Sequence, residues 1–299
     1  MRYTPCVLPG LDPLDHLAAE NVMLETLDAE QALLVFYING PSVIIGRNQN
    51  PWREVAPGAP APFFRRASGG GAVYHDEGNL NWAFIVPRHR HDQDAELEAL
   101  ARGISACGVD VEPGARGGIY CGLSSGYGGR KVSGTARRFS PRSVLHHGTV
   151  LVSSDMRHLR ASLGGIETLD DHSIASVPAS PVNLADIVPG LTVQRVMETM
   201  SMSITGARPS ALPPGLIDGS RLEQEKLKLS SHDWLYGATP PFTVEVESGG
   251  KQVTMDVRAG MLERVEASGL PASALEGYIG RAFSFGAIDE IRASLSSRQ

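Results

Sequence analysis

The chain has 299 residues, 42% of them hydrophobic, which is enough for one large domain and a small one. Its 27 lysines and arginines and 33 aspartates and glutamates give a net charge of −6. This balance excludes a general attraction to nucleic acid or to an anionic membrane, so basic groups must act locally.

The three cysteines, Cys6, Cys107 and Cys121, show no CxxC spacing and leave an odd number. They argue against a disulfide framework and against a thiolate zinc site. The N-terminal segment lacks the apolar stretch of a signal peptide, and no segment approaches the roughly 18 apolar residues that span a bilayer. We therefore expect a cytoplasmic protein.

The first half of the chain predicts one helix and several strands. Asp12 and Pro13 are typical of a helix start, and apolar residues at helical spacing follow as far as Leu27, with Glu20 inside this helix. Residues 33–38 and 42–45 flank Asn39-Gly40, which predicts an antiparallel hairpin. Further strands are expected at 63–66, leading into a glycine run, and at 80–86.

In the second half, residues 95–107 are expected to be helical and 113–129 to form a mobile, glycine-rich loop. A strand at 144–152 should feed a helix at 155–163. Strands and helices do not alternate strictly, which disfavours a doubly wound parallel sheet. The pattern further predicts helices at 194–203 and 222–229. It also predicts a hairpin at 242–247 and 252–257, followed by one or two helices at 272–297. We expect domains at 1–240 and 241–299.

The segment from Phe64 to Asn79 contains Arg65 and Arg66 followed by three consecutive glycines, Gly69 to Gly71. Glycine backbones can turn their N–H groups onto an anion, and arginine supplies a fixed positive charge. The segments 129–136 and 146–149 again combine cations, small residues and hydroxyls. Together they indicate a site for phosphate or carboxylate groups, in which Arg66 and Lys131 could neutralise both anions.

In order and approximate spacing, these three segments resemble the lipoate–protein ligase family, which is part of the group that also contains the biotin ligases. The resemblance extends upstream to 46–52 and downstream to 150–155 with Leu159, and weakens after about residue 190. It implies an α+β fold like that of class II aminoacyl-tRNA synthetases and biotin ligases. Such a fold has a mixed, largely antiparallel sheet flanked by helices, here with a small α+β C-terminal domain.

The resemblance implies an ATP-dependent ligase that activates lipoate or octanoate as acyl-AMP and transfers the acyl group to a lysine of a carrier domain. ATP would bring Mg²⁺ on its phosphates, and the carrier would resemble H-protein or a dehydrogenase E2 domain. No nucleic acid or membrane partner is implied. Lys131 would contact the acyl carboxyl and the phosphate. Nucleotide-binding residues would be Arg66, Gly71, Ala72, Val73 and Tyr74, and the acyl and adenylate lining would be Ser68, Gly69, Gly70, His75, Asn79, Ser133, Gly134, Thr135, His147 and Gly148.

Two of the polar positions have alternative interpretations. His146 and His147 are neighbours on a strand and point to opposite faces, so only one can line the site. Asp76 is as well suited to capping a turn as to binding Mg²⁺. The segment 115–129 would close over the adenylate as a lid, and Arg130, Arg137 and Arg138 at its rim would meet an acidic carrier.

The sequence departs from the family where Arg-Asn-Asp usually precedes the catalytic lysine, because residues 115–120 read Ala-Arg-Gly-Gly-Ile-Tyr. Two alternatives stay open. One is an octanoyl transferase that uses Cys121 as nucleophile, and the other is a non-catalytic acyl-binding relative. Motifs of P-loop enzymes, dinucleotide-binding enzymes, α/β-hydrolases and zinc proteases are not found.

Overall fold

The computed structural model describes residues 2–296, apart from the side chain of Ser125, and it has the expected mixed α+β fold with largely antiparallel sheets flanked by helices. The main sheet has six strands, and its two central strands are buried along their whole length. Pairing is antiparallel except where β1 joins its two neighbours. In spatial order the strands are β10 (Thr135–Phe139), β11 (Ser143–Leu151), β6 (Asn79–Pro87), β2 (Leu33–Tyr37), β1 (Thr4–Val7) and β13 (Ser210–Ala211).

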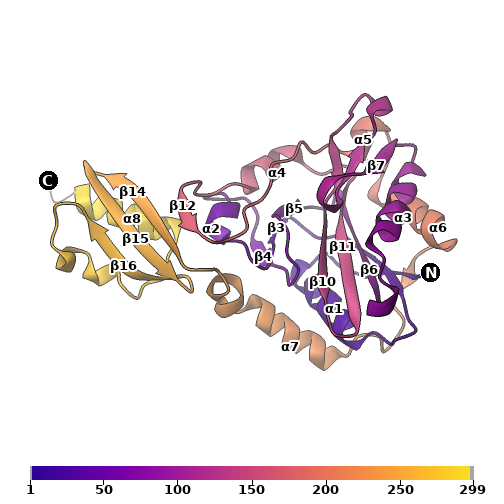
Figure 1. The fold of residues 1–299 in the computed structure, drawn as a ribbon, viewed down its shortest axis with the longest axis horizontal. Helices are drawn as coiled ribbons and strands as arrows, with labels where there is room; N and C mark the ends of the chain where they lie inside the picture. Colours follow the sequence, from indigo (N-terminus) through magenta and orange to yellow (C-terminus); the bar gives the residue numbers. More distant parts are fainter. Residues whose placement is uncertain (1, 297–299) are drawn as a thin grey trace.

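Helices cover both faces of the main sheet, and the strand alternation decides which side chains meet them (Figure 1). Leu34 and Phe36 pack toward α3 (Gln93–Ser105) and α6 (Val193–Thr205) in the largest core. Leu33 and Val35 pack toward α1 (Pro13–Thr26) on the other face. The start of α1 is as expected, because the Asp12 side chain accepts from the amide of Leu14.

The predicted hairpin around Asn39-Gly40 is wrong. Strand β2 pairs with β1 and β6, whereas β3 (Ser42–Ile45) belongs to a second sheet in the order β4-β3-β5, with β4 (Phe63–Arg65) and β5 (Val73–His75). Asn39 is fully buried, and its side-chain amide lies between two histidines, so it joins the two sheets instead of closing a tight turn. The turn preference of Asn39-Gly40 was outweighed by the pairing of β2 and β3 with strands from distant parts of the sequence.

The predicted loop 113–129 is partly regular. Strands β7 (Val111–Pro113), β8 (Ile119–Cys121) and β9 (Lys131–Ser133) form a small antiparallel sheet, and backbone hydrogen bonds tie Cys121 to Gly129 and Arg130. The sheet forms because Ile119, Cys121 and Val132 are buried in the largest core. The mobility of this segment stays a prediction.

The C-terminal part has its own sheet and core. The predicted hairpin is confirmed as β14 (Phe242–Ser248) and β15 (Lys251–Arg258), joined by β16 (Met261–Ala267) and covered by α8 (Phe285–Ser296). Strand β12 (Leu169–Asp171) adds a fourth strand, and Trp52 of α2 (Pro51–Glu54) packs into the same core. Because both come from earlier in the chain, the division at residue 240 stays a proposal.

The remaining helices connect these bodies. Figure 1 shows α7 (Gly219–Ser230) running below the main body toward the C-terminal sheet, and α4 (Met156–Ser162) and α5 (Leu184–Ile187) lie on the opposite side. No helix within residues 2–296 is long and apolar enough to cross a bilayer.

Arg65 links these parts. It is 0% exposed, and its guanidinium donates to the carbonyl oxygens of Gln49 at 2.7 Å and Leu235 at 2.7 Å and to the Thr239 hydroxyl at 2.8 Å. No carboxylate in the described part of the chain pairs with it. Burial, and then the nearby charge of Arg47, lowers the pKa of Arg65 to about 10. The group acts as a multiple donor to backbone carbonyls.

We expect Arg65→Lys to lower the free energy of unfolding by about 2 to 4 kcal/mol, since a buried acceptor left without its donor costs about 1 to 3 kcal/mol. Urea unfolding measures this. Arg157→Lys is the control, because that side chain is 90% exposed and should change stability by less than about 0.5 kcal/mol. Equal effects of the two substitutions would contradict the role of Arg65.

Candidate functional site

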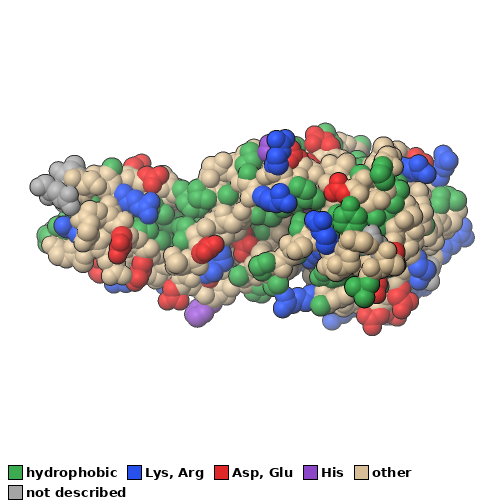
Figure 2. All heavy atoms as spheres, turned by 90° about the horizontal axis from the view of Figure 1, so that it is seen from above, with side chains coloured by type: hydrophobic (Ala, Val, Ile, Leu, Met, Phe, Trp, Pro, Cys, Tyr) green, Lys and Arg blue, Asp and Glu red, His purple; other side chains and the backbone are tan. Residues whose placement is uncertain are grey.

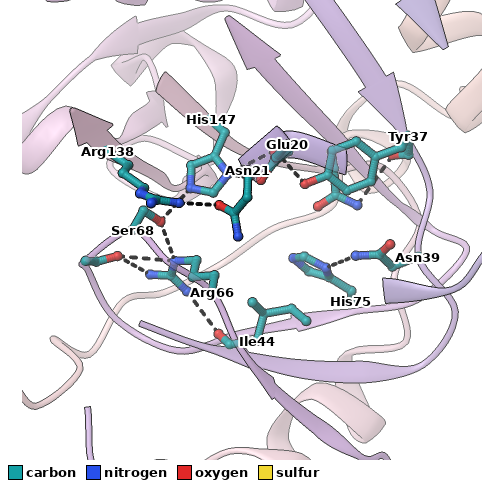
Figure 3. Close-up of polar contacts among 12 residues, drawn as sticks. Glu20, Asn21, Tyr37, Asn39, Ile44, Arg66, Ser68, His75, Arg138 and His147 are labelled. Carbon is teal, nitrogen blue, oxygen red and sulfur yellow. Dashed lines mark hydrogen bonds and ion pairs between the residues drawn. The ribbon is translucent and has the colours of Figure 1, made fainter. Parts of the chain in front are cut away.

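Four of the predicted site residues, Arg66, Ser68, His75 and His147, lie close together (Figure 3), and the Ser68–His147 contact joins the segment after β4 to β11. The glycine run follows directly after Ser68. Gly70 has φ +87°, a left-handed conformation that favours glycine, and a Cβ on Gly46 would lie 2.1 Å from the Gly70 carbonyl oxygen. The backbone of the glycine run therefore packs directly on the end of β3.

Arg66 holds the glycine run from inside. It is 6% exposed and donates to the carbonyl oxygens of Gly69 at 2.6 Å, Gly71 at 2.8 Å and Ile44 at 3.0 Å, and to the Ser68 hydroxyl at 3.1 Å. Burial lowers the pKa of Arg66 to about 10, and the charge of Glu20 opposes this shift. In this state the guanidinium is engaged by the chain itself. Its role in nucleotide binding stays a prediction.

Two kinds of positive group remain available for an anion. Within residues 2–296, the amides of Gly69, Gly70 and Gly71 have no hydrogen-bond partner, and the Lys131 ammonium has neither a hydrogen bond nor an ion pair. Burial, and then the charge of Arg116, lowers the pKa of Lys131. Unpaired amides and a half-buried cation are both groups that fit a phosphate or carboxylate.

The segment after Lys131 folds close to this cation. A Cβ on Gly134 would lie 3.4 Å from Lys131 Nζ, and a Cβ on Gly148 would lie 2.1 Å from the Gly134 carbonyl oxygen. Thr135 lies beside Gly148 in the β10–β11 pair and donates to the Gly117 carbonyl at 2.8 Å. The predicted residues Gly134, Thr135 and Gly148 therefore lie together, and adjacent Ser133 is buried with an unpaired hydroxyl.

As expected, the side chains of His146 and His147 point to opposite faces of β11. His147 points toward the glycine run, with Nε2 2.6 Å from the Ser68 hydroxyl and Nδ1 2.8 Å from a Glu20 oxygen. His146 points to the opposite face, where its Nδ1 lies 2.7 Å from Glu96. Only His147 lines the candidate site.

His75 and Asn39 form a buried polar cluster below the glycine run. Asn39 bridges His16 and His75, and Nε2 of His75 has no partner among the described residues although the side chain is 4% exposed. Asn79, which is fully buried, donates to Asn81 at 3.1 Å, and its carbonyl oxygen is likewise unpaired. These two unpaired groups are candidate ligand contacts.

The remaining predicted residues contribute mainly through the backbone. The Ala72 amide donates to the Ser176 hydroxyl at 2.8 Å, so it is occupied in this state. Val73 packs on the cluster around Ile44, and the Tyr74 ring is buried with Val43. The side chains of Val73 and Tyr74 therefore stabilise the small sheet.

Sequence reasoning missed the segment 172–182. Ser176 donates to Glu54 and accepts from Gln49 at 3.0 Å, while Lys131 exchanges backbone hydrogen bonds with Ser180 and Val182. The segment thus connects the glycine run to the lysine strand. It carries no motif that could have identified it. Glu20 and Tyr37 were also missed as site residues, and a carboxylate inside an otherwise apolar helix face was the available signal.

Asp76 caps a turn. Its two carboxylate oxygens accept from the amides of Gly78 at 2.9 Å and Asp155 at 2.8 Å. No group of three metal-binding side chains occurs within residues 2–296. The residues present fit an anion, and a magnesium ion would have to be held by the phosphates of a bound nucleotide.

The expected rim of arginines is wrong. Arg138 turns toward α1, where it donates to Asn21 at 2.6 Å and pairs with Glu25 at 3.4 Å, and Arg130 donates to the Pro181 carbonyl at 2.6 Å. Of these three arginines, only Arg137 is exposed, as the alternation along β10 requires for the neighbour of Arg138. Figure 2 shows basic and acidic side chains interspersed over one face of the molecule.

Residues 12–205 match the family model of the lipoyl protein ligase A/B catalytic domain. The chain belongs to this family. The match covers the helix with Glu20, the glycine run, Lys131 and the strand with His147, and so includes every residue predicted for the site.

Several solved structures share the fold. P. falciparum LipL1 in complex with lipoate is 18% identical, with a TM-score of 0.66 over 98% of this chain and 99% of that one. The bipartite lipoate protein ligase of Thermoplasma acidophilum, studied with its E2 lipoyl domain, is 20% identical, with a TM-score of 0.62 over 79% and 96%. A lipoate-protein ligase A bound with ATP is 21% identical, with a TM-score of 0.62 over 78% and 98%.

We expect Gly70→Ala to cost about 1 to 2 kcal/mol of stability, because its φ of +87° is unfavourable for alanine and its Cβ would lie 3.0 Å from Arg66 Nη2. Binding of pyrophosphate, an anion probe, should weaken as the glycine run shifts. Gly69→Ala is the matched control, since its Cβ meets nothing within 4 Å. Calorimetry of both variants checks the prediction, and equal losses would contradict it.

Acidification should destabilise the fold through His75. Burial, and then the charges of Arg66, His147 and His16, lowers the pKa of His75 from 6.5 to about 3. Between pH 6.5 and about pH 3, His75 is protonated in the unfolded chain but not in the folded one. The free energy of unfolding therefore decreases as the pH falls from 6.5 to about 3. In His75→Gln the slope of unfolding free energy against pH should drop by up to about 1.4 kcal/mol per pH unit. Exposed His89→Gln should leave the slope unchanged.

Proposed function

We propose that the chain is an ATP-dependent lipoate–protein ligase. The observation that carries this proposal is a set of groups for an anion that have no partner within residues 2–296: the Lys131 ammonium next to Gly134, and the amides of the glycine run, whose Gly70 lies against Thr135 and Ala136. A carboxylate and a triphosphate repel each other, so joining them needs fixed positive groups and preorganised donors in one place. Family membership and the lipoate- and ATP-bound structures of the same fold support the choice of substrates.

In the first step the acyl carboxylate oxygen attacks the α-phosphorus of ATP, and the bond to pyrophosphate breaks. Lys131 Nζ would lie between the two anions, and the amides of Gly69 to Gly71 would hold the charge that develops. In the second step a carrier lysine amine attacks the acyl carbon and AMP leaves, so no protein nucleophile is needed. Magnesium would reach the site on the phosphates.

We propose a lipoyl carrier domain as the protein partner, of the H-protein or dehydrogenase E2 type, and the cytoplasm as the compartment. One structural relative of the same fold was studied together with an E2 lipoyl domain. The acyl acid would be lipoate or octanoate.

The cysteine-dependent alternative is disfavoured by burial. Cys121 is 1% exposed and packs in the largest core with Ile119 and Val132, whereas a nucleophilic thiol needs access to its substrate. The non-catalytic alternative rests on the family residues missing from 115–120. Their place holds Arg116, whose charge acts on Lys131.

We expect Lys131→Ala to lower the rate of acyl-AMP formation by about 100-fold or more, because it removes the cation that would lie between the acyl carboxylate and the α-phosphate. The melting temperature should stay close to that of the wild type. Acyl-AMP is measured by mass spectrometry with lipoate and ATP before any carrier is added. A variant that makes acyl-AMP at the wild-type rate would refute the assignment of Lys131.

Cys121→Ser serves as the control in the same assay and should keep both half-reactions. An acyl-thioester trapped on Cys121, or transfer lost in a folded serine variant, would favour the transferase alternative. Wild-type protein that binds lipoate and ATP without forming acyl-AMP would favour the non-catalytic one.

A further inference from the structure

A chain of hydrogen bonds crosses the site from one charged group to another. The Arg66 guanidinium lies 3.1 Å from the Ser68 hydroxyl, Ser68 lies 2.6 Å from His147 Nε2, and His147 Nδ1 lies 2.8 Å from Glu20 (Figure 3). The Tyr37 hydroxyl donates to the same carboxylate at 2.9 Å. All five residues are at most 6% exposed.

We propose that Glu20 is a positioning residue that fixes the direction of this hydrogen-bond chain, and that the direction decides which way round the acyl acid binds. The inference rests on the proposed function for the identity of the ligand. It concerns a carboxylate on α1 that lies 49 residues before Gly69, the first residue of the glycine run, and that bonds His147 and Tyr37.

The direction follows from what each group can donate. The Glu20 carboxylate only accepts, and both of its oxygens lie within 3.0 Å of His147 Nδ1, so Nδ1 carries the ring proton. Ser68 already accepts from Arg66, and within residues 2–296 His147 Nε2 is the one acceptor in reach of the Ser68 hydroxyl hydrogen, so we infer that Nε2 carries no proton and accepts. Ser68 must then donate its hydroxyl hydrogen to His147, and Arg66 donates to the Ser68 oxygen. Every hydrogen bond from Arg66 through Ser68 and His147 is therefore donated in the direction of Glu20.

Ser68 is thereby left without a hydrogen for a ligand. It can face an apolar chain or a donor, but it repels a carboxylate, whose oxygens only accept. The amides of Gly69 to Gly71 and the Lys131 ammonium, in contrast, offer only hydrogens. The acid therefore binds with its carboxylate toward Lys131 and its hydrocarbon chain toward Ser68 and His147, which is the orientation that activation requires.

The opposite face of β11, the strand that carries His147, provides a matched control. His146 and Glu96 form a second buried histidine–carboxylate pair, 2.7 Å apart with both side chains 1% exposed, but this pair faces α3. Glu96→Gln removes a buried carboxylate from α3, on the other face of β11, without touching the site. Any effect of Glu20→Gln that reflects only the loss of a buried pair should appear in Glu96→Gln as well.

The experiment compares Glu20→Gln with Glu96→Gln in two measurements that need no turnover. The first is the ¹⁵N spectrum of His147. We expect the proton on Nδ1 in the wild type and in Glu96→Gln, and on Nε2 in Glu20→Gln, because the amide donates to Nδ1. The second is calorimetric binding of octanoate with and without Lys131→Ala.

In the wild type, Lys131→Ala should weaken octanoate binding about tenfold, as expected for loss of a charge-assisted hydrogen bond. In the Glu20→Gln background the released Ser68 hydroxyl competes for the carboxylate, so the effect of Lys131→Ala should shrink to about twofold. Adding Ser68→Ala to Glu20→Gln removes the competing hydroxyl and should restore the tenfold effect.

A wild-type His147 protonated on Nε2, or an equal effect of Lys131→Ala in both backgrounds, would overturn the inference. An effect of Glu96→Gln as large as that of Glu20→Gln would overturn it too. Failure of the proposed function looks different, because the proton position and the binding coupling would be as expected while wild-type protein makes no acyl-AMP.

Discussion

Two neighbouring arginines at the end of β4 satisfy backbone carbonyl groups that would otherwise be buried without a donor, and the arrangement of the site depends on this. Arg65 reaches the segment before α2 and the segment after α7. Arg66 reaches the end of β3 and the glycine run. An unpaired buried carbonyl is costly, so the two guanidinium groups hold four loops in fixed positions.

This use of arginine explains the electrostatics of the site. Burial lowers the pKa of both arginines, and neither has a carboxylate of residues 2–296 within hydrogen-bond reach. Within residues 2–296 the amides of the glycine run stay unpaired, and the charge that acts on Lys131 is that of Arg116. Glu20, the buried carboxylate of the cluster, is held by His147 and Tyr37. The unpaired amides and the Lys131 ammonium are thus in place for an anion before one arrives.

The second constraint is that polar side chains lie where the six-stranded sheet meets the small sheet β4-β3-β5. Asn39, His75 and Asn79 lie at this junction, and each is satisfied mainly by other side chains. Such a cluster is tolerated where a ligand completes it, since unpaired groups like His75 Nε2 are otherwise expensive. The polar junction and the anion pocket are therefore parts of one site.

The sequence by itself determined the α+β class, the family, the helix that begins at Asp12, and the separation of His146 from His147, because these follow from local periodicity and motif spacing. Only the tertiary structure decided the partners of β2 and β3, the small sheet inside 113–129, the turning of Arg138 onto α1 and the attachment of 172–182 to the glycine run. Each of these depends on contacts between residues far apart in the chain. Local preferences carry no information about which distant carbonyl, carboxylate or apolar face will offer the better partner.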